Sequence, residues 1–191
     1  MLSDLKLIEA SVNSDLASDP IIHSPGVQNV IRAMIVAEDR RFCFHCGVDV
    51  KGIARAGLKF LSGARLEGAS TIEQQFVRTA RGRYEITINR KLTECLLAIL
   101  VSSRHSKAII AYSYLEIGYF GWRANGVQQA ARRLGIDLLN ASEVEAAALA
   151  AMLKLPMPRF PSQRYAARHT QRVEYILKNW NEVGEQNGFT F

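Results

Sequence analysis

The chain reads VQNVIRAMIVAE over residues 27–38 and DRRFCFHCGVD over residues 39–49, so a regular apolar pattern runs directly into a charged turn. The apolar side chains of the first stretch recur at intervals of three and four residues: Val30, Ile31, Met34 and Ile35. This spacing predicts an amphipathic helix from about residue 27 to residue 38. At about 3.6 residues per turn, Glu38 falls in the middle of the same apolar stripe.

Glu38 is therefore a candidate catalytic residue. A carboxylate on an apolar face is costly to bury in its charged form, and such a group is typical of a general base or acid. The alternative is that the helix has already ended, in which case Glu38 is an exposed residue paired with Arg40 or Arg41. The pattern alone does not choose between these two interpretations.

Outward from this stretch, helical patterns account for most of the chain. We expect helices over residues 53–61, 70–80, 89–102, 106–118, 125–134, 141–153 and 165–180. Residues 1–25 are polar and end in Pro20 and Pro25, so they are expected to form an arm that lies outside the core. Since no segment alternates at the period of a strand, the predicted fold class is mainly α.

Composition narrows the class of protein. The chain has 191 residues, of which 48% are hydrophobic and 22% charged, as in one globular domain and unlike a disordered or fibrous protein. Its formal net charge of +6 favours an anionic partner: nucleic acid, an anionic membrane surface or a phosphorylated substrate. The longest apolar run, residues 95–101, is too short for a transmembrane helix, and the acidic N-terminus does not resemble a signal peptide.

A polar ladder follows a glycine-containing loop. Ser70, with Glu73 three residues later, predicts a capping box at a helix start. Beyond it, polar side chains recur at helical spacing, whereas Ile72 and Phe76 point to the other face; the polar residues are Thr71, Gln74, Gln75 and Arg78. Such a stripe at a helix N-terminus suits the binding of sugar hydroxyls or phosphate. A solvated helix face is the alternative.

The helix predicted over residues 89–102 is apolar nearly all round, so we expect it to be a buried, central helix. Its charges are confined to its start, at Arg90, Lys91 and Glu94. They indicate either a polar cleft reached by the first turn of this helix or a simple surface pair between Arg90 and Glu94, which would contribute little to stability.

Cys43 and Cys46 form a CxxC pattern, but the only other cysteine, Cys95, is remote in sequence. A structural zinc site needs about four ligands, so neither a metal site nor redox chemistry is expected here.

Five segments together resemble the peptidoglycan glycosyltransferases, glycosyltransferase family 51. Residues 38–49 match the pattern E-D-x-x-F-x-x-H-x-G-x-D, residues 68–75 resemble G-x-S-T-x-x-Q-Q, and residues 90–94 resemble R-K-x-x-E. Residues 114–131 and 145–156 resemble the fourth and fifth family motifs in the same order. On this basis we expect an N-terminal arm at residues 1–26, a glycosyltransferase domain at 27–180 and a tail at 181–191.

The resemblance implies a lysozyme-like, two-lobed helical domain with a long substrate cleft and a small membrane-facing jaw near residues 53–66. It implies that lipid II and lipid-linked glycan are joined through β-1,4 bonds, with inversion and release of undecaprenyl diphosphate. The partners would be these lipids, an anionic membrane surface and other cell-wall synthesis proteins, but not nucleic acid. The enzyme would act peripherally on the outer, periplasmic face of the bacterial cytoplasmic membrane.

The resemblance also assigns roles to residues. Glu38 matches the catalytic base, and Glu94 matches a second catalytic glutamate that would act directly or through a divalent cation, magnesium or manganese. The expected substrate-binding residues are Asp39, Arg40, Phe42, His45, Ser70, Thr71, Gln74, Gln75, Arg78, Arg90 and Lys91. Among them, Arg78, Arg90 and Lys91 would complement the diphosphate.

The chain departs from the family pattern at two positions. Glu116 stands where the fourth motif usually has Asn, and Glu73 stands where a small hydroxyl residue is usual. The membrane anchor that precedes the family domain is not in the sequence, which indicates either a trimmed domain or one that binds membranes through its jaw alone. The rival interpretations are a lytic transglycosylase or lysozyme-like enzyme, and a membrane- or wall-binding helical module with weak or no activity.

Overall fold

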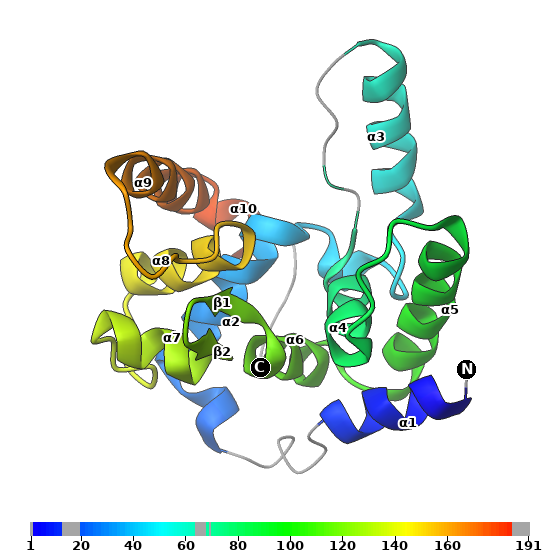
Figure 1. Ribbon diagram of the computed structural model, residues 1–191, viewed down its shortest axis with the longest axis horizontal. Helices are drawn as coiled ribbons and strands as arrows, with labels where there is room; N and C mark the ends of the chain where they lie inside the picture. The colour runs from blue at the N-terminus through cyan, green and yellow to red at the C-terminus, as the bar shows by residue number, and fades with distance from the viewer. Residues whose placement is uncertain (1, 13–19, 64–67, 69, 185–191) are drawn as a thin grey trace.

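The computed structural model describes residues 2–12, 20–63, 68 and 70–184. Helices dominate this part of the chain, which confirms the mainly α prediction (Figure 1). They are α1 (Leu2–Ser11), η2 (Pro20–His23), α2 (Pro25–Glu38), η3 (Phe42–Phe44), α3 (Val50–Leu61), α4 (Ile72–Arg81), α5 (Ile88–Arg104), α6 (Lys107–Ile117), α7 (Val127–Leu134), α8 (Glu143–Lys154), α9 (Gln163–Lys178) and α10 (Trp180–Gly184). The strands β1 (Tyr119–Gly121) and β2 (Ala124–Asn125) form a small antiparallel sheet.

One lobe is built around α2, which packs against α8, α9 and α10 (Figure 1). Pro25 occupies the first turn of α2, where a missing N–H costs nothing. Gly26 allows a close approach: a Cβ there would lie 2.3 Å from the backbone nitrogen of Ala141. Four alanines of α8 are buried, and these small side chains let α8 lie close along α2: Ala146, Ala147, Ala150 and Ala151.

The other lobe is built around α4, which packs against α5, α6 and α1. Residues 2–11 were expected to belong to an arm outside the core, and this is wrong. Ile8 is fully buried and is part of the core. Oδ1 of Asp4 lies 3.2 Å from Nε of Arg81, the last residue of α4. The apolar side chains of this short segment are too few to stand out as a pattern, but they suffice to cover one side of α4. Of the predicted tail, residues 185–191 lie outside the described residues.

Helix α5 also differs from its prediction as a central helix buried all round. Leu97, Ala98 and Val101 are buried on one face, but Leu92 and Leu96 on another face are more than half exposed. Only one side of α5 packs on α4 and α6, because the helix lies at the outer edge of its lobe (Figure 1). Its second apolar face is therefore open to the surroundings.

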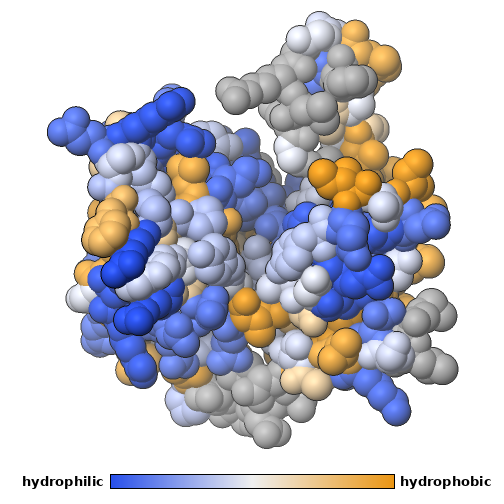
Figure 2. Space-filling model, viewed as in Figure 1, coloured by the Kyte–Doolittle hydropathy of each residue, from blue (hydrophilic) through white to orange (hydrophobic). Residues whose placement is uncertain are grey.

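Helix α3 projects away from both lobes (Figure 1). It begins at Val50, earlier than the helix expected from residue 53, so Gly52 lies inside the helix. Its exposed apolar side chains include Val50, Leu58 and Leu61, and hydrophobic atoms show on this part of the surface in Figure 2. Of the expected jaw, residues 64–67 lie outside the described residues. In the described part of the chain, no helix is both long and apolar enough to cross a bilayer.

The hairpin of β1 and β2 is tied to the chain that follows α8. Met157 accepts a hydrogen bond from the backbone N–H of Trp122 and donates one to the carbonyl of Phe120, both at 2.8 Å. Gly121 has a φ of 135°, and a Cβ there would lie 2.2 Å from the carbonyl oxygen of Met157. These contacts fix Met157 against the hairpin.

Candidate active site

A polar cleft of about 750 Å³ lies between the two lobes, and Figure 2 shows the molecule hollowed there. Its described lining brings together α2, the loop after it, α3, α4, the end of α8, and α9. The cations among its lining residues outnumber the acids: Arg40, Arg41, Arg55, Lys59, Arg78, Lys154 and Arg172 against Glu38, Asp39 and Asp49. This balance suits a ligand that carries several negative charges.

Glu38 is the last residue of α2 and lines this cleft. Its side chain is 6% exposed, and Oε1 accepts a hydrogen bond of 2.7 Å from Nη2 of Arg172 on α9. The alternative in which Glu38 is exposed and paired with Arg40 or Arg41 is wrong, because Arg40 pairs with Glu182 and Arg41 with Asp49. The apolar stripe correctly placed this carboxylate in a poorly solvated position.

A second contact orients the other oxygen of Glu38. Gln75 of α4 donates from Nε2 to Oε2 of Glu38 at 3.2 Å, and its own Oε1 accepts from the hydroxyl of Tyr114 at 2.9 Å. Burial raises the pKa of Tyr114, so its hydroxyl stays protonated and donates to Gln75. The hydrogen-bonded chain from Tyr114 through Gln75 to Glu38 fixes which way the Gln75 amide faces. Together with Arg172 on Oε1, it gives each carboxylate oxygen of Glu38 a partner.

In the polar ladder at the start of α4, Thr71 and Gln74 are buried and Gln75 and Arg78 are partly buried, so the alternative of a solvated helix face is wrong. The capping box is formed by Thr71 and Gln74, not by Ser70 and Glu73. Gln75 lines the cleft together with Arg78, but Gln74 lies behind it, where Oε1 accepts from Lys91 at 2.9 Å. Ser70 and Thr71 line the cleft just before the N-terminal end of α4.

Glu94 lies in a separate ionic cluster at the start of α5. Its side chain is 1% exposed, and its two oxygens bind Arg90 and Lys91, the latter at 2.8 Å. The surface-pair alternative is therefore wrong, but none of these three residues is in the described lining of the cleft. Lys91 connects the cluster to the cleft, because its Nζ also lies 3.1 Å from Oγ of Ser70.

The arrangement around Glu94 does not fit a divalent cation. Both carboxylate oxygens already face cationic side chains, so a metal ion there would be repelled by the same two groups that neutralise the carboxylate.

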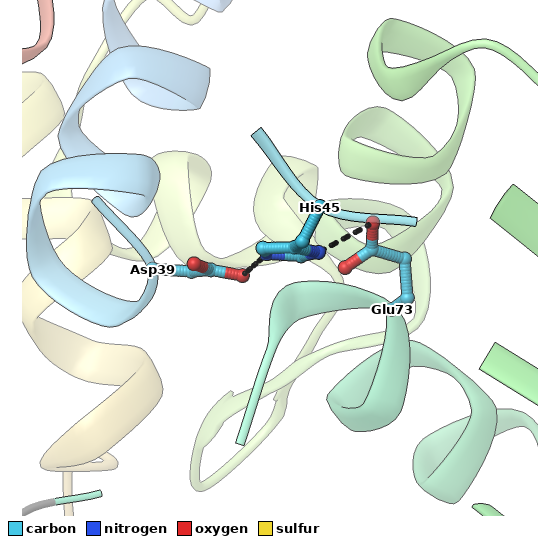
Figure 3. Close-up of side chains that lie close together, drawn as sticks. All are labelled: Asp39, His45 and Glu73. Atoms are coloured by element: carbon cyan, nitrogen blue, oxygen red, sulfur yellow. Dashed lines mark hydrogen bonds and ion pairs between the residues drawn. The ribbon is translucent and has the colours of Figure 1, made fainter. Parts of the chain in front are cut away.

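Several residues of the first motif lie behind the cleft wall. Phe42 is fully buried in the core, and the side chain of His45 is 4% exposed. Nε2 of His45 lies 3.0 Å from Oδ2 of Asp39, and that oxygen also accepts from the backbone N–H of Ile72 at 3.1 Å (Figure 3). Asp39 and His45 therefore fix the loop against the start of α4, and Phe42 and His45 are outside the described cleft lining.

No spacing in the sequence points to the partner of Glu73. This glutamate is fully buried, and Lys107, the first residue of α6, binds its Oε1 and also donates to the carbonyl of His45 at 2.8 Å. Burial raises the pKa of Glu73, and the nearby Lys107 acts in the opposite direction. Asp39, His45 and Glu73 lie close enough together to share a metal ion, but Lys107 already supplies a cation at the glutamate (Figure 3).

Arg172 was also missed as a site residue. It belongs to a run of arginines spaced four residues apart on α9, Arg164, Arg168 and Arg172, which places them near one face of the helix. This regular basic face was the available signal, but nothing in it says that one member meets Glu38, 134 residues earlier.

Residues 13–181 match a family model described as Transglycosylase. The chain is 33% identical over 186 residues to a protein named Penicillin-binding protein 1A from Rickettsia prowazekii (strain Madrid E), covering 95% of this chain and 23% of that protein. Proteins of the same name from Aquifex aeolicus (strain VF5) and Neisseria lactamica are 36% and 40% identical, over 82% and 78% of this chain and 22% and 19% of theirs. The chain thus spans about a fifth of the length of these relatives.

Proposed function

The chain belongs to the transglycosylase family, and from this we propose that it is a peptidoglycan glycosyltransferase that polymerises lipid II into β-1,4-linked glycan. One observation carries the proposal: a poorly solvated glutamate, Glu38, held on both oxygens at the edge of a cleft lined by an excess of cations. A cationic cleft suits a diphosphate-bearing donor, whereas cleavage of a finished glycan has no diphosphate to stabilise.

Glu38 acts as the general base in this proposal. It accepts the proton of the acceptor 4-hydroxyl while that oxygen forms a bond to the anomeric carbon of the donor. The bond from the anomeric carbon to the diphosphate oxygen breaks on the opposite side, so the configuration inverts and undecaprenyl diphosphate leaves with the bonding electrons. Since Arg172 and Gln75 already orient the carboxylate, it needs little reorganisation to take the proton.

The leaving diphosphate gains negative charge, and we assign its stabilisation to cleft cations on the α3 and α4 side: Arg55, Lys59 and Arg78. Lys91 lies directly behind Ser70, at the same end of the cleft. Each guanidinium or ammonium group provides a charge-assisted contact at the place where charge develops. Because the arrangement around Glu94 does not fit a divalent cation, these side chains carry the neutralisation.

The lipid carriers of both substrates require contact with a membrane. The exposed apolar residues of α3, among them Leu58 and Leu61, stand beside basic residues of the same helix and suit an anionic bilayer surface. We therefore place the protein peripherally at the outer face of the bacterial cytoplasmic membrane, with further cell-wall synthesis proteins as partners.

The test is incubation with labelled lipid II in detergent. We expect a polymer that lysozyme digests, and we expect Glu38→Gln to lower turnover by about 10²-fold or more while lipid II still binds. The matched control is Glu143→Gln, which alters an exposed glutamate at the start of α8 and leaves the rate unchanged. Near-normal turnover in Glu38→Gln removes this residue as the base. Solubilisation of cell walls without any product from lipid II overturns the proposed reaction.

A further inference from the structure

An arginine cluster on the lobe that contains α8 is not used by the proposed reaction. The guanidinium carbons of Arg123, Arg133 and Arg159 lie 4.7, 5.5 and 5.1 Å from the centre of the Trp122 ring. Arg159 also lies 5.0 Å from the centre of the Phe160 ring. We call these five residues the Trp122 cluster. One aromatic ring thus collects three positive charges on an exposed surface.

The cluster stands on a fixed base. Arg133 donates to the carbonyl of Trp122 and, at 2.7 Å, to the carbonyl of Pro158, so it joins the hairpin to the segment after α8. The paired hydrogen bonds of Met157 connect the same two segments. Trp122, Arg123 and Arg159 are therefore presented by backbone that is held in place from both sides, which reduces the ordering needed when a ligand binds.

The arrangement of charge indicates a binding role. Arg123 lies in the two-residue turn between β1 and β2 and has the positive φ, 54°, that such a tight turn requires. Arg123 and Arg159 are exposed, and neither forms an ion pair with any carboxylate in the part of the chain that the structure describes. Like charges gathered without an internal partner are relieved when an anionic partner binds.

We propose that the Trp122 cluster binds the growing glycan through the free carboxylates of its stem peptides; the identity of this ligand rests on the proposed function. Arginine pairs with carboxylates in a bidentate geometry that lysine cannot provide. The cluster is outside the described cleft lining, so it suits a polymer that extends along the surface.

The position of the cluster supports the glycan as its occupant. Leu153 and Lys154, at the end of α8, line the cleft, and Arg159 and Phe160 follow a few residues later. A strand that follows the chain away from the end of α8 therefore reaches Arg159 and Phe160. Helix α5 belongs to the other lobe and α3 projects beyond both lobes, so the helices that carry the exposed apolar residues best suited to a bilayer are separate from the cluster (Figure 1).

The test measures binding of fluorescently labelled, uncrosslinked glycan strands that carry stem peptides. We expect the double variant Arg123→Gln/Arg159→Gln to bind them about tenfold more weakly than the parent protein, as the loss of two exposed charge pairs implies. The charge-matched control is Arg164→Gln/Arg168→Gln on α9, expected to bind within about twofold of the parent. Arg133 is left in place because it fixes the base of the cluster. An unfolding midpoint equal to that of the parent shows that the double variant is folded.

A second arm needs no variant. The same strands, after their carboxyl groups have been converted to amides with carbodiimide and ammonia, are expected to bind the parent protein as weakly as native strands bind the double variant. Equal affinity for native and amidated strands, or for parent and double variant, overturns the proposal. So does a double variant that loses binding to anionic phospholipid vesicles but keeps its affinity for the strands, since the cluster is then a membrane contact.

Lipid II consumption separates this proposal from the proposed function. We expect the double variant to keep the initial rate of the parent, because the cluster lies outside the cleft lining, but to release shorter strands. A parent protein that binds strands but never consumes lipid II refutes the function and leaves the binding surface standing.

Discussion

Replacing Lys107 by Met removes the cation that faces the fully buried carboxylate of Glu73. Removing one partner of a buried pair typically costs about 3–5 kcal/mol, because a charge is left uncompensated. Here the cost has an upper limit, since Glu73 can take up a proton instead. With an unperturbed pKa of 4.5 and about 1.4 kcal/mol per pH unit, neutralising Glu73 costs about 3.4 kcal/mol at pH 7 and about 0.7 kcal/mol at pH 5. We therefore expect Lys107→Met to lose about 3 kcal/mol at pH 7 and under about 1 kcal/mol at pH 5.

The pH dependence follows from the direction of the shift. Burial raises the pKa of Glu73 in the folded protein, so the folded state binds its proton more tightly than the unfolded state does. Stability from this group therefore falls as pH rises from below 4.5 through the folded pKa. Loss of Lys107 removes a group that lowers this pKa, and the variant is accordingly most impaired at neutral and alkaline pH.

The two partners should respond unequally. The side chain of Lys107 is 22% exposed and keeps the carbonyl of His45 as an acceptor, so Glu73→Gln should cost about 1 kcal/mol or less. The double variant Lys107→Met/Glu73→Gln should resemble Glu73→Gln alone. Urea unfolding followed by circular dichroism at pH 7 and pH 5 measures all three, with Lys178→Met on the exposed end of α9 as the control. A cost for Lys107→Met that does not change between these pH values, or a larger cost for Glu73→Gln, refutes the reasoning.

Two further predictions concern the N-terminal helix and the cysteines. Ile8→Ala should lower the free energy of unfolding by about 2–5 kcal/mol, because this side chain is fully buried. Leu7→Ala, at an exposed position, should change it by no more than about 0.5 kcal/mol in the same urea titration. Equal losses in the two variants would show that α1 is an arm outside the core. Burial raises the pKa of Cys43 to about 12, and Cys46 is exposed. We therefore expect Cys46 to react first with Ellman's reagent at pH 8. A fast phase of reaction that remains in the Cys46→Ser variant would contradict this.

The sequence predicted what local periodicity determines. Two features were predicted from the sequence: the helix that ends at Glu38, and the side of α4 that buries Ile72 and Phe76. Both follow from spacing along a single helix, which determines the direction of each side chain. The apolar residues that share its stripe made a poorly solvated Glu38 one of two open interpretations, and the structure confirms that one.

What the sequence could not supply was the partner of each charge. Glu38 meets Arg172 and Glu73 meets Lys107 across 134 and 34 residues, and no spacing rule covers such contacts. The exposed face of α5 was misjudged for a related reason, since an apolar helix shows that it has apolar sides but not how many neighbouring helices are available to cover them. Helix α1 is the converse case: its apolar pattern is weak, yet Ile8 is buried because α1 packs against α4.

Glu38 and Asp39 are neighbours in the chain, yet their carboxylates are held from different directions. Glu38 is bound by Arg172 of one lobe and by Gln75 of the other, while Asp39 holds the backbone of Ile72. This dipeptide therefore connects both walls of the cleft. Any separation of the lobes must lengthen the contact of Glu38 with Arg172 or its contact with Gln75. The width of the cleft and the orientation of the Glu38 carboxylate are therefore coupled.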